Sequence, residues 1–349
     1  MQLWFAADLS AVTVITRWPT RVCDSFPSGQ ANPLNSLNHP FSSLSMRRRY
    51  ESWFLRLGLA DGCGAWWIRY LLTNPGRNGC PGNPLGAPAQ LWATWFPAGG
   101  KPQSFIQGFA CNEIEIAPSK SPFHLSIGDA SIDENSCRGA LQLEGHQLAW
   151  NLQYASRFRV TMSNKGWIGF SRTPHSDAVF SGEISLDGRI FRGYPLGFGV
   201  QGHNCGYRHR AYWIWTHACF LQQQGSVSTL EALLYEMPWG LTFQKAVLWH
   251  HQQGYQLRNL RTVQVSRETM KWEFISKARN GLLLKASISG GGASLHRLPY
   301  LKTDCAGTFE VANNSLATAS LSLEGLGGSE ILETSGGAVL EMAGNYLDV

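Results

Sequence analysis

The chain has 349 residues, of which 37 are Gly, 14 are Trp and only 15% are charged. Its 29 basic and 24 acidic residues give a net charge of +5, part of which is the run Arg47-Arg48-Arg49. No basic stripe with interleaved aromatics recurs, so nucleic acid is not an expected partner. The length suffices for one large or two ordinary domains.

The first part of the chain, residues 1–45, holds four prolines among Ser and Asn and predicts an extended arm laid over the body of the protein. No cationic segment precedes its apolar patches, and Asp8 interrupts them, so a secretory signal is not expected. No run approaches the roughly 18–20 apolar residues of a membrane span. We predict a cytoplasmic protein and leave peripheral contact with an anionic membrane open, along with the oligomeric state.

Short strand-like runs, separated by Gly, Pro, Asn or Asp-Gly signals, follow from residue 46 to about 172. They cover 50–57, 65–72, 90–96, 105–109, 113–117, 123–127, 139–143 and 148–154. Eight strands can close a small antiparallel barrel that holds one ligand. We therefore predict an N-terminal β domain over 46–172.

A second series of runs begins near 179 and turns at Asp187-Gly188, a hairpin signal. The runs cover 179–186, 189–193, 212–221, 227–235, 241–250, 254–257, 261–265, 270–277, 281–287, 307–311 and 316–323. Only 329–345 has some helical or tail character. The prediction is an all-β fold of two antiparallel barrels or sheets packed side by side, with the C-terminal domain over 173–349.

The most informative stretch is Gly202-His203-Asn204-Cys205-Gly206, followed by an aromatic strand over 212–220. Alternation places Trp213, Trp215 and His217 on one face of that strand. Both faces are apolar, which indicates a buried strand. A turn bounded by Gly202 and Gly206 would place polar groups at the mouth of an apolar cavity. A hydrophobic ligand is therefore expected.

Two blocks of the sequence resemble a known family. They are Arg49-Tyr50-Glu51-Ser52-Trp53-Phe54-Leu55-Arg56-Leu57 with Ala65-Trp66-Trp67-Ile68-Arg69-Tyr70, and Val200-Gln201-Gly202-His203-Asn204-Cys205-Gly206 with Trp213-Ile214-Trp215 and Leu230-Glu231. They look like the lipocalin-like group of tocopherol cyclases, carotenoid 1,2-hydratases (hydroxyneurosporene synthases) and fungal decalin-forming Diels–Alderases. The resemblance covers 46–345 in order, although relatives more commonly carry Trp in place of Cys205. It implies that both domains are lipocalin-like.

Two carboxylates lie on apolar strand faces, where a lone charge is out of place. Glu51 shares its face with Trp53, and it either pairs with Arg69 in the next strand or acts as a general acid whose pKa is raised by burial. Glu231 presents the same problem and matches the acidic position that follows the aromatic strand in relatives. We favour Glu231 as the catalytic acid, with Glu51 in reserve.

His203 and Asn204 complete the predicted catalytic set. His203 would donate a proton to an oxygen of the ligand or orient it, and Asn204 would fix that oxygen. The alternative is that both side chains merely satisfy the backbone of the turn. The predicted substrate-binding residues are Trp53, Arg69, Tyr70, Trp213, Trp215, His217 and Tyr235.

Other chemistries find little support in the sequence. His203, Cys205, His209, His217 and Cys219 crowd one segment without the paired spacing of zinc ligands, and the adjacent His250-His251 should point to opposite strand faces. No metal or cofactor is therefore predicted. The eight scattered cysteines indicate mostly buried thiols in a reducing compartment. Nucleophile-elbow and dinucleotide-binding motifs are absent.

The predicted function is a cofactor-free cyclase or hydratase, that is, an isomerase or a lyase. It would act by acid catalysis on a polyprenyl or polyene substrate in a pocket lined with aromatics. A pericyclase of the Diels–Alderase type and a non-catalytic lipid or pigment carrier stay open, and a carbohydrate-binding protein would need exposed Trp platforms. The feature that discriminates is whether Glu51 or Glu231 faces an enclosed cavity.

Overall fold

The computed structural model describes residues 36–40, 48–143, 145–156, 158–161, 169–222, 227–236, 241–325 and 327–344. Within these ranges the regular structure is β, apart from the short 3-10 turns η2 (Pro75–Arg77) and η3 (Cys111–Glu113). The prediction of an all-β, lipocalin-like fold is confirmed. No helix in the described residues is long and apolar enough to cross a membrane. Most of the predicted arm, 1–35 and 41–45, lies outside the described residues.

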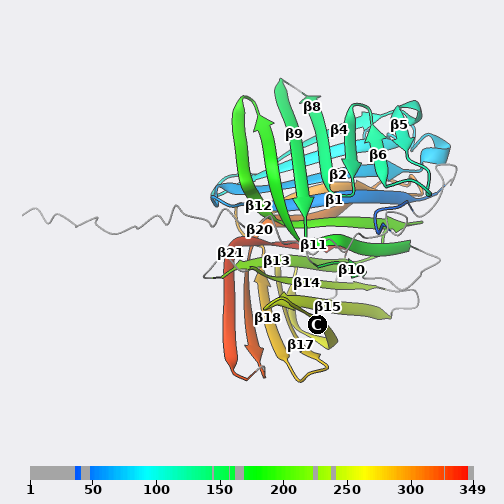
Figure 1. The fold of residues 1–349 in the computed structure, drawn as a ribbon. Coiled ribbons are helices and arrows are strands. Elements are labelled where there is room, and N and C mark those ends of the chain that lie inside the picture. The colour runs from blue at the N-terminus through cyan, green and yellow to red at the C-terminus, as the bar shows by residue number, and fades with distance from the viewer. Residues whose placement is uncertain are drawn as a thin grey trace, which may run out of the picture.

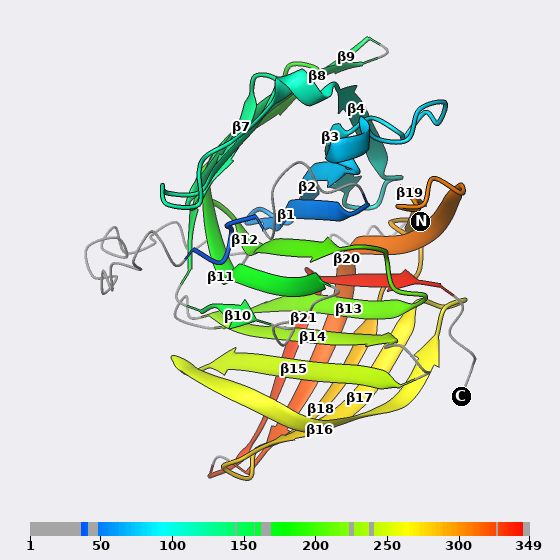
Figure 2. The same ribbon diagram turned by 90° about the vertical axis from the view of Figure 1, so that its right-hand side faces the viewer.

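The first sheet contains twelve antiparallel strands and curls into a nearly closed barrel (Figures 1 and 2). Its strands are β1 (Tyr50–Leu59), β2 (Gly64–Thr73), β3 (Ala89–Pro97), β4 (Gln103–Phe109), β5 (Ile114–Ile116), β6 (His124–Ile127), β7 (Ala130–Asp133), β8 (Ser136–Leu143), β9 (His146–Ala155), β10 (Val160–Thr161), β11 (Gly169–Leu186) and β12 (Arg189–Gly206). They run in the order β4-β3-β2-β1-β12-β11-β9-β8-β7-β6-β5, with β10 beside β11.

The second sheet contains nine strands. They are β13 (Trp213–Leu221), β14 (Val227–Glu236), β15 (Thr242–His250), β16 (Gln253–Ser266), β17 (Lys271–Ala278), β18 (Leu283–Ser289), β19 (His296–Leu301), β20 (Thr308–Glu324) and β21 (Ser329–Ala343). Their order is β18-β17-β16-β15-β14-β13-β21-β20-β19, and β18 also pairs with β20. That last pairing closes the sheet into a barrel and leaves β19 outside it.

The chain changes sheets between Gly206 and Trp213, and not at 172/173 where the sequence analysis divides it. The strands β11 and β12 form the hairpin predicted at Asp187-Gly188, and β12 pairs with β1. The pairing of β11 shifts register around His175. The polar residues and the proline of this segment break the alternation of apolar residues, so the sequence did not predict a strand here. Residues 173–206 therefore belong to the first sheet.

Two further expectations are wrong. Residues 329–343 form the strand β21 and have no helical character, because they pair with β20 along the strand and with β13 over 338–343. His203 and Asn204 lie inside β12 and not in a turn, opposite Trp53 and Ser52 of β1. Their directions therefore follow strand alternation, and they point to opposite faces of the first sheet.

The two barrels pack sheet against sheet, as Figure 2 shows, with β1, β11 and β12 facing β13, β14 and β21. Each barrel has its own apolar interior. A third cluster fills part of the interface, with Phe54 and Val200 from the first sheet and Trp215, Leu233, Val247 and Val339 from the second. Buried apolar area of this kind stabilises the pairing of the two units.

Arg56 of β1 adds a polar clasp to this interface. Its side chain is fully buried, and its guanidinium donates to the carbonyl oxygens of Ser315, Gly336, Gly337 and Ala338 in the β20–β21 region. Desolvation lowers the pKa of Arg56 to about 10, which still leaves it charged at neutral pH. One arginine of the first barrel thus satisfies four carbonyl groups of the second.

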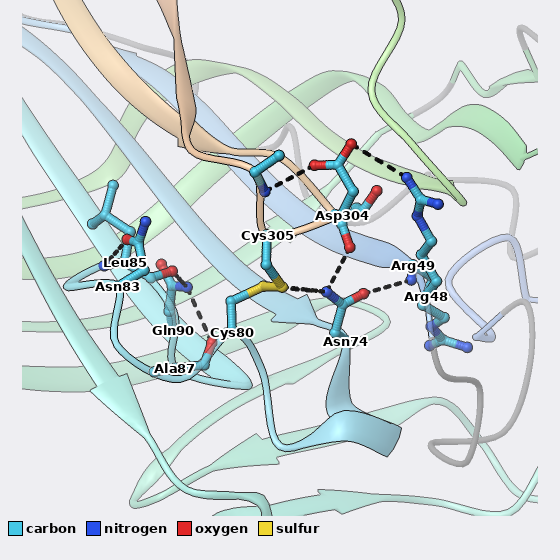
Figure 3. Close-up of a disulfide and its surroundings, with 12 residues drawn as sticks. Arg48, Arg49, Asn74, Cys80, Asn83, Leu85, Ala87, Gln90, Asp304 and Cys305 are labelled. Atoms are coloured by element: carbon cyan, nitrogen blue, oxygen red, sulfur yellow. Dashed lines mark hydrogen bonds and ion pairs between the residues drawn. A yellow bond between two sulfur atoms is a disulfide. The ribbon is translucent and has the colours of Figure 1, made fainter.

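A disulfide between Cys80 and Cys305 joins the loop after η2 to the loop between β19 and β20 (Figure 3). Beside it, Asn74 Nδ2 donates to the carbonyl oxygen of Thr303 at 2.8 Å. The expectation of unpaired cysteines is wrong for this pair, because two positions far apart in the sequence meet across the two sheets. Cys63, Cys111, Cys137, Cys205 and Cys219 are free thiols.

Candidate functional site: a cavity between the two barrels

A cavity of about 120 Å³ lies where the two sheets face each other. Its walls come from both barrels and are rich in aromatic rings. The lining residues include Tyr50, Ser52, Phe54, Trp67, Arg69, Phe170, Asn204, Arg208, His209, Arg210, Trp213, Trp215, Tyr235, Tyr300 and Glu341. The cavity is therefore a property of the assembled pair and not of either barrel alone.

Strand alternation explains which side chains reach this cavity. In β1, Glu51 and Trp53 point into the first barrel, so Ser52 and Phe54 point out toward the second sheet. In β13, Ile214 lies inside the second barrel, so Trp213 and Trp215 point toward the first. Both faces of 212–220 are apolar because one face packs into the interior of the second barrel and the other packs into this interface.

Arg69 of β2 carries a buried positive charge into the cavity wall, with only 4% of the residue exposed. Its guanidinium carbon lies 4.5 Å from the ring centroid of Tyr300 and 5.4 Å from that of Trp92. Its Nε donates to Ser52 Oγ at 2.6 Å. Cation–π contacts and this hydrogen bond hold the guanidinium in place, so it is a fixed donor for an oxygen atom of a ligand.

Glu341 of β21 faces the same cavity from the second barrel. Trp213 Nε1 donates to its Oε1 at 2.8 Å, and Asn313 Nδ2 donates to its Oε2 at 3.2 Å. Burial raises the pKa of Glu341 above its ordinary value, although these donors and the charge of Arg69 act in the opposite direction. A carboxyl group whose pKa is raised at the edge of an aromatic cavity is suited to general acid chemistry.

His209 forms part of the aromatic wall. Its ring stacks on Tyr50 with the centroids 3.9 Å apart, and Phe309 lies 5.2 Å away. Burial, together with the charge of Arg69, lowers the pKa of His209 to about 3, so the imidazole is neutral at neutral pH. It can therefore accept a hydrogen bond at one nitrogen and donate at the other.

A second cavity, of about 670 Å³, adjoins the first and shares Arg208, His209 and Arg210 with it. The remaining charged side chains around it are Arg48, Glu236, Arg267, Lys302, Asp304 and Glu310. Asp304 pairs with Arg48 and Glu310 with Arg267, which leaves more basic than acidic groups. The aromatic cavity thus opens beside a larger, cationic one.

Five of the eleven predicted site residues line the aromatic cavity, namely Asn204, Arg69, Trp213, Trp215 and Tyr235. The other six do not line it, and they are Glu51, His203, Glu231, Trp53, Tyr70 and His217. Neither carboxylate favoured from the sequence therefore lines the aromatic cavity, whereas Glu341 does.

Glu51 and His203 form a closed polar cluster inside the first barrel. Glu51 pairs with Arg49, and its Oε1 lies 2.9 Å from His203 Nε2. His203 Nδ1 donates to the carbonyl oxygen of Leu37 at 2.9 Å, and the ring stacks on Trp53. The alternative in which Glu51 pairs with Arg69 is wrong, because Arg69 points to the opposite face of the sheet, where it contacts Ser52.

Glu231 is buried in the interface behind the cavity wall. It accepts hydrogen bonds from Thr173 Oγ1 at 2.7 Å, Ser176 Oγ at 3.1 Å and Trp215 Nε1 at 3.1 Å. Burial raises its pKa, and these donors partly offset the shift. Because Trp215 lines the cavity and bonds to Glu231, this carboxylate positions a wall residue.

The remaining three predicted residues also have structural partners. Trp53 Nε1 donates to the carbonyl oxygen of Asn38, and Tyr70 Oη donates to the carbonyl oxygen of Arg138 inside the first barrel. His217 bonds to the carbonyl oxygen of Ser176, and burial lowers its pKa to about 3. These side chains stabilise the barrels and do not line the aromatic cavity.

Glu341, Tyr300, His209 and Tyr50 were not predicted as site residues. The sequence offered one signal for Glu341, a lone carboxylate in the apolar run 338–343, but 329–345 was interpreted as having helical or tail character. Tyr300 lies on β19, a strand that was not predicted from the sequence. A correct assignment of β21 would have added Glu341 to the candidate acids.

One group of metal-ligating side chains occurs among the described residues, formed by His250, His251 and Glu330. The two histidine rings lie 3.8 Å apart, so the expectation that they point to opposite faces is wrong. His251 has a φ of 47° and belongs to the turn after β15, where strand alternation no longer holds. This group lies outside the lining of both cavities.

No known protein-family profile matches the chain, and no curated protein sequence matches it either. Kievitone hydratase from Nectria haematococca has a similar structure, with 10% sequence identity over 86% of this chain and 90% of the other and a TM-score of 0.50. A protein provisionally assigned as AttH from Nitrosomonas europaea matches over 87% of this chain and 95% of its own, with 13% identity and a TM-score of 0.49. At such identities the likeness to the hydratase bears on the fold, which both chains share.

Proposed function

We propose that this protein is a cofactor-free, acid-assisted hydratase or cyclase, and that its reaction takes place in the aromatic cavity between the two barrels. The observation that carries the proposal is the carboxyl group of Glu341, which lines an aromatic cavity with a pKa raised by burial. A carrier of apolar molecules has no need of a carboxyl group there, since burying one is costly. The hydratase with the same fold is consistent with this proposal.

In this proposal Glu341 donates a proton to an unsaturated bond of the substrate. Trp213, Trp215 and Tyr235 offer ring faces that stabilise developing positive charge, each by about 0.5–2 kcal/mol. Water or a hydroxyl of the substrate then captures the cation, which gives hydration or ring closure. Glu341 regains a proton from the capturing oxygen, so the protein is unchanged at the end of the cycle.

Arg69 restricts the kind of substrate. A fixed guanidinium repels a carbocation beside it, so the reacting carbon should lie toward Trp215 and Tyr235, and an electron-rich oxygen should lie toward Arg69. Asn204, which also lines the cavity, can bond to the same oxygen. We therefore propose a substrate with a carbonyl or phenol oxygen next to an apolar unsaturated chain.

The sizes of the two cavities agree with a substrate that has a reacting segment and a longer remainder. A drug-sized ligand needs about 300–1,000 Å³, whereas the aromatic cavity offers about 120 Å³. The reacting segment would fill it, and the rest of the molecule would extend into the adjoining cavity of about 670 Å³.

A pericyclic reaction is the second candidate, because Arg69 and Asn204 supply donors to a carbonyl oxygen without any proton transfer. This alternative predicts that replacing Glu341 with Gln leaves turnover nearly intact, whereas proton donation predicts its loss.

The test is incubation of the full chain with a panel of prenylated phenols and linear polyenes in water enriched in ¹⁸O, followed by mass spectrometry. Hydration adds one ¹⁸O atom to the product, and cyclisation gives an isomer of unchanged mass with a different retention time. Binding of several panel members without any product would overturn the catalytic proposal in favour of a carrier.

A further inference from the structure

The second barrel carries a group of side chains that the cavity between the barrels does not use. His250 is the last residue of β15, His251 begins the two-residue turn into β16, and Glu330 is the second residue of β21. His251 and Gln252 both have positive φ values, 47° and 62°. This tight hairpin turn swings the ring of His251 back beside that of His250.

The ligand atoms of these side chains converge on one point. His250 Nε2 lies 3.2 Å and His251 Nε2 lies 3.5 Å from the same atom, Glu330 Oε2. A tetrahedral zinc ion bound at about 2.0–2.1 Å by each ligand requires neighbouring ligand atoms about 3.3–3.4 Å apart. Both measured distances are within about 0.2 Å of this tetrahedral edge. All three atoms lie within 4.8 Å of one another.

Two further residues hold the ligands in position. His250 Nδ1 lies 2.8 Å from Ser228 Oγ, a contact that fixes the ring and leaves Nε2 toward Glu330. Gln222 Nε2 donates to Glu330 Oε1 at 3.0 Å and leaves Oε2 toward the two histidines. Supporting hydrogen bonds of this kind orient the ligands in metal sites.

Burial falls from one ligand to the next. His250 is 1% exposed, whereas the side chains of His251 and Glu330 are 64% and 39% exposed. An ion held by these three groups would therefore have one side open to water, which can complete a tetrahedral set.

Other histidine–carboxylate pairs of this protein lack these features. His146 lies 2.6 Å from Asp187, and His124 lies 2.6 Å from Asp133, each with a single histidine. Neither pair belongs to a group of three ligand atoms within the described residues. These pairs are ordinary surface contacts, and His146 serves as the control below.

We propose that His250, His251 and Glu330 bind one divalent transition-metal ion, with Zn²⁺ as the best match to the ligand types and their spacing. The ion would tie the β15–β16 hairpin to the start of β21. Strand β14, which carries Ser228, and β13 lie between β15 and β21 in the sheet. The site is therefore a structural one that pins one end of the second barrel, and it is independent of the reaction proposed above.

The test is calorimetric titration of the EDTA-treated full chain with ZnCl₂ alone, and with CoCl₂ in a parallel absorption experiment. We expect one saturable site, a rise in Tm on loading, and a visible absorption band of tetrahedral Co²⁺. His251→Ala and Glu330→Gln should each weaken binding at least about tenfold. His251 is exposed and Glu330 is only half-buried, so these variants should fold.

His146→Ala is the matched control, and it should bind Zn²⁺ as the unchanged protein does. Equal binding by His251→Ala and by the unchanged protein would place the ion elsewhere, on the free cysteines or other histidines, and would overturn the proposal. Absence of saturable binding would show that the three side chains form an ion pair only.

Discussion

The disulfide between Cys80 and Cys305 leads to a prediction whose magnitude follows from the chain itself. The two cysteines are 225 residues apart. In the chain-entropy treatment, closing a loop of that size removes about 18 cal/mol/K from the unfolded state, which is about 5 kcal/mol of stability at 25 °C. With an unfolding entropy near 2.1 cal/mol/K per residue, the double variant Cys80→Ser, Cys305→Ser should melt about 7 °C lower.

The bond also affects the candidate site, because Lys302, Thr303 and Asp304 of the same loop line the larger cavity. Loss of the bond should therefore weaken binding of panel ligands in addition to lowering stability. The assay is calorimetry of the unchanged protein with and without dithiothreitol, beside the double variant, with peptide mapping of the cross-link. Cys305 is exposed, so the reductant can reach it. Equal Tm values for all three samples would refute this reasoning.

Three other substitutions test separate parts of the structure. Arg56→Met should destabilise the protein by about 3 kcal/mol, because it leaves four interface carbonyls without their charged donor. A change under about 0.5 kcal/mol in chemical denaturation would show that these hydrogen bonds do not stabilise the interface. Trp213→Phe removes a donor that lowers the pKa of Glu341, so this pKa should rise and the loss of turnover at high pH should move to higher pH. An unchanged pH profile would show that the two groups are not coupled. Glu231 has a raised pKa in the folded protein, so its contribution to stability is complete below the ordinary value of 4.5 and is lost as pH rises through the folded pKa. The free energy of unfolding of Glu231→Gln should therefore rise relative to that of the unchanged protein as pH rises. A constant difference from pH 4 to 8 would show that Glu231 does not titrate there.

Local signals in the sequence were sufficient for the fold class. Alternation and turn residues located most strands, and Asp187-Gly188 marked the hairpin between β11 and β12. The strands that were missed or mistaken lack clean alternation. In β21, for example, the pairing shifts register opposite Asn314 and Ala317, near Gly336 and Gly337. Bulges of this kind break the period of two on which sequence patterns depend.

The candidate site was harder to predict because it is assembled across the two barrels. Alternation showed that Trp213 and Trp215 share a face, but it could not show that this face meets Arg69 of the other sheet. Glu341 reaches Trp213 across 128 residues because β13 pairs with β21. Glu51 and His203 were both named as candidates from the sequence, but their contact with each other inside the first barrel was not predicted. Which face of a strand meets a cavity is decided by long-range pairing, and local patterns do not contain it.

The central claim is that Glu341 is the proton donor in the cavity between the barrels. Its most direct test compares Glu341→Gln with the matched control Glu231→Gln, which replaces the other carboxylate of the interface whose pKa is raised by burial. Both variants are assayed on whichever panel compound the unchanged protein converts, with binding measured separately. We predict that Glu341→Gln lowers kcat by about 10²–10⁴-fold while the compound still binds. Glu231→Gln keeps an oxygen that accepts from Trp215 Nε1, so the wall residue stays in place and kcat should stay within about threefold. Full activity of Glu341→Gln with a large loss in Glu231→Gln would contradict the claim and return the acid to the position first favoured from the sequence.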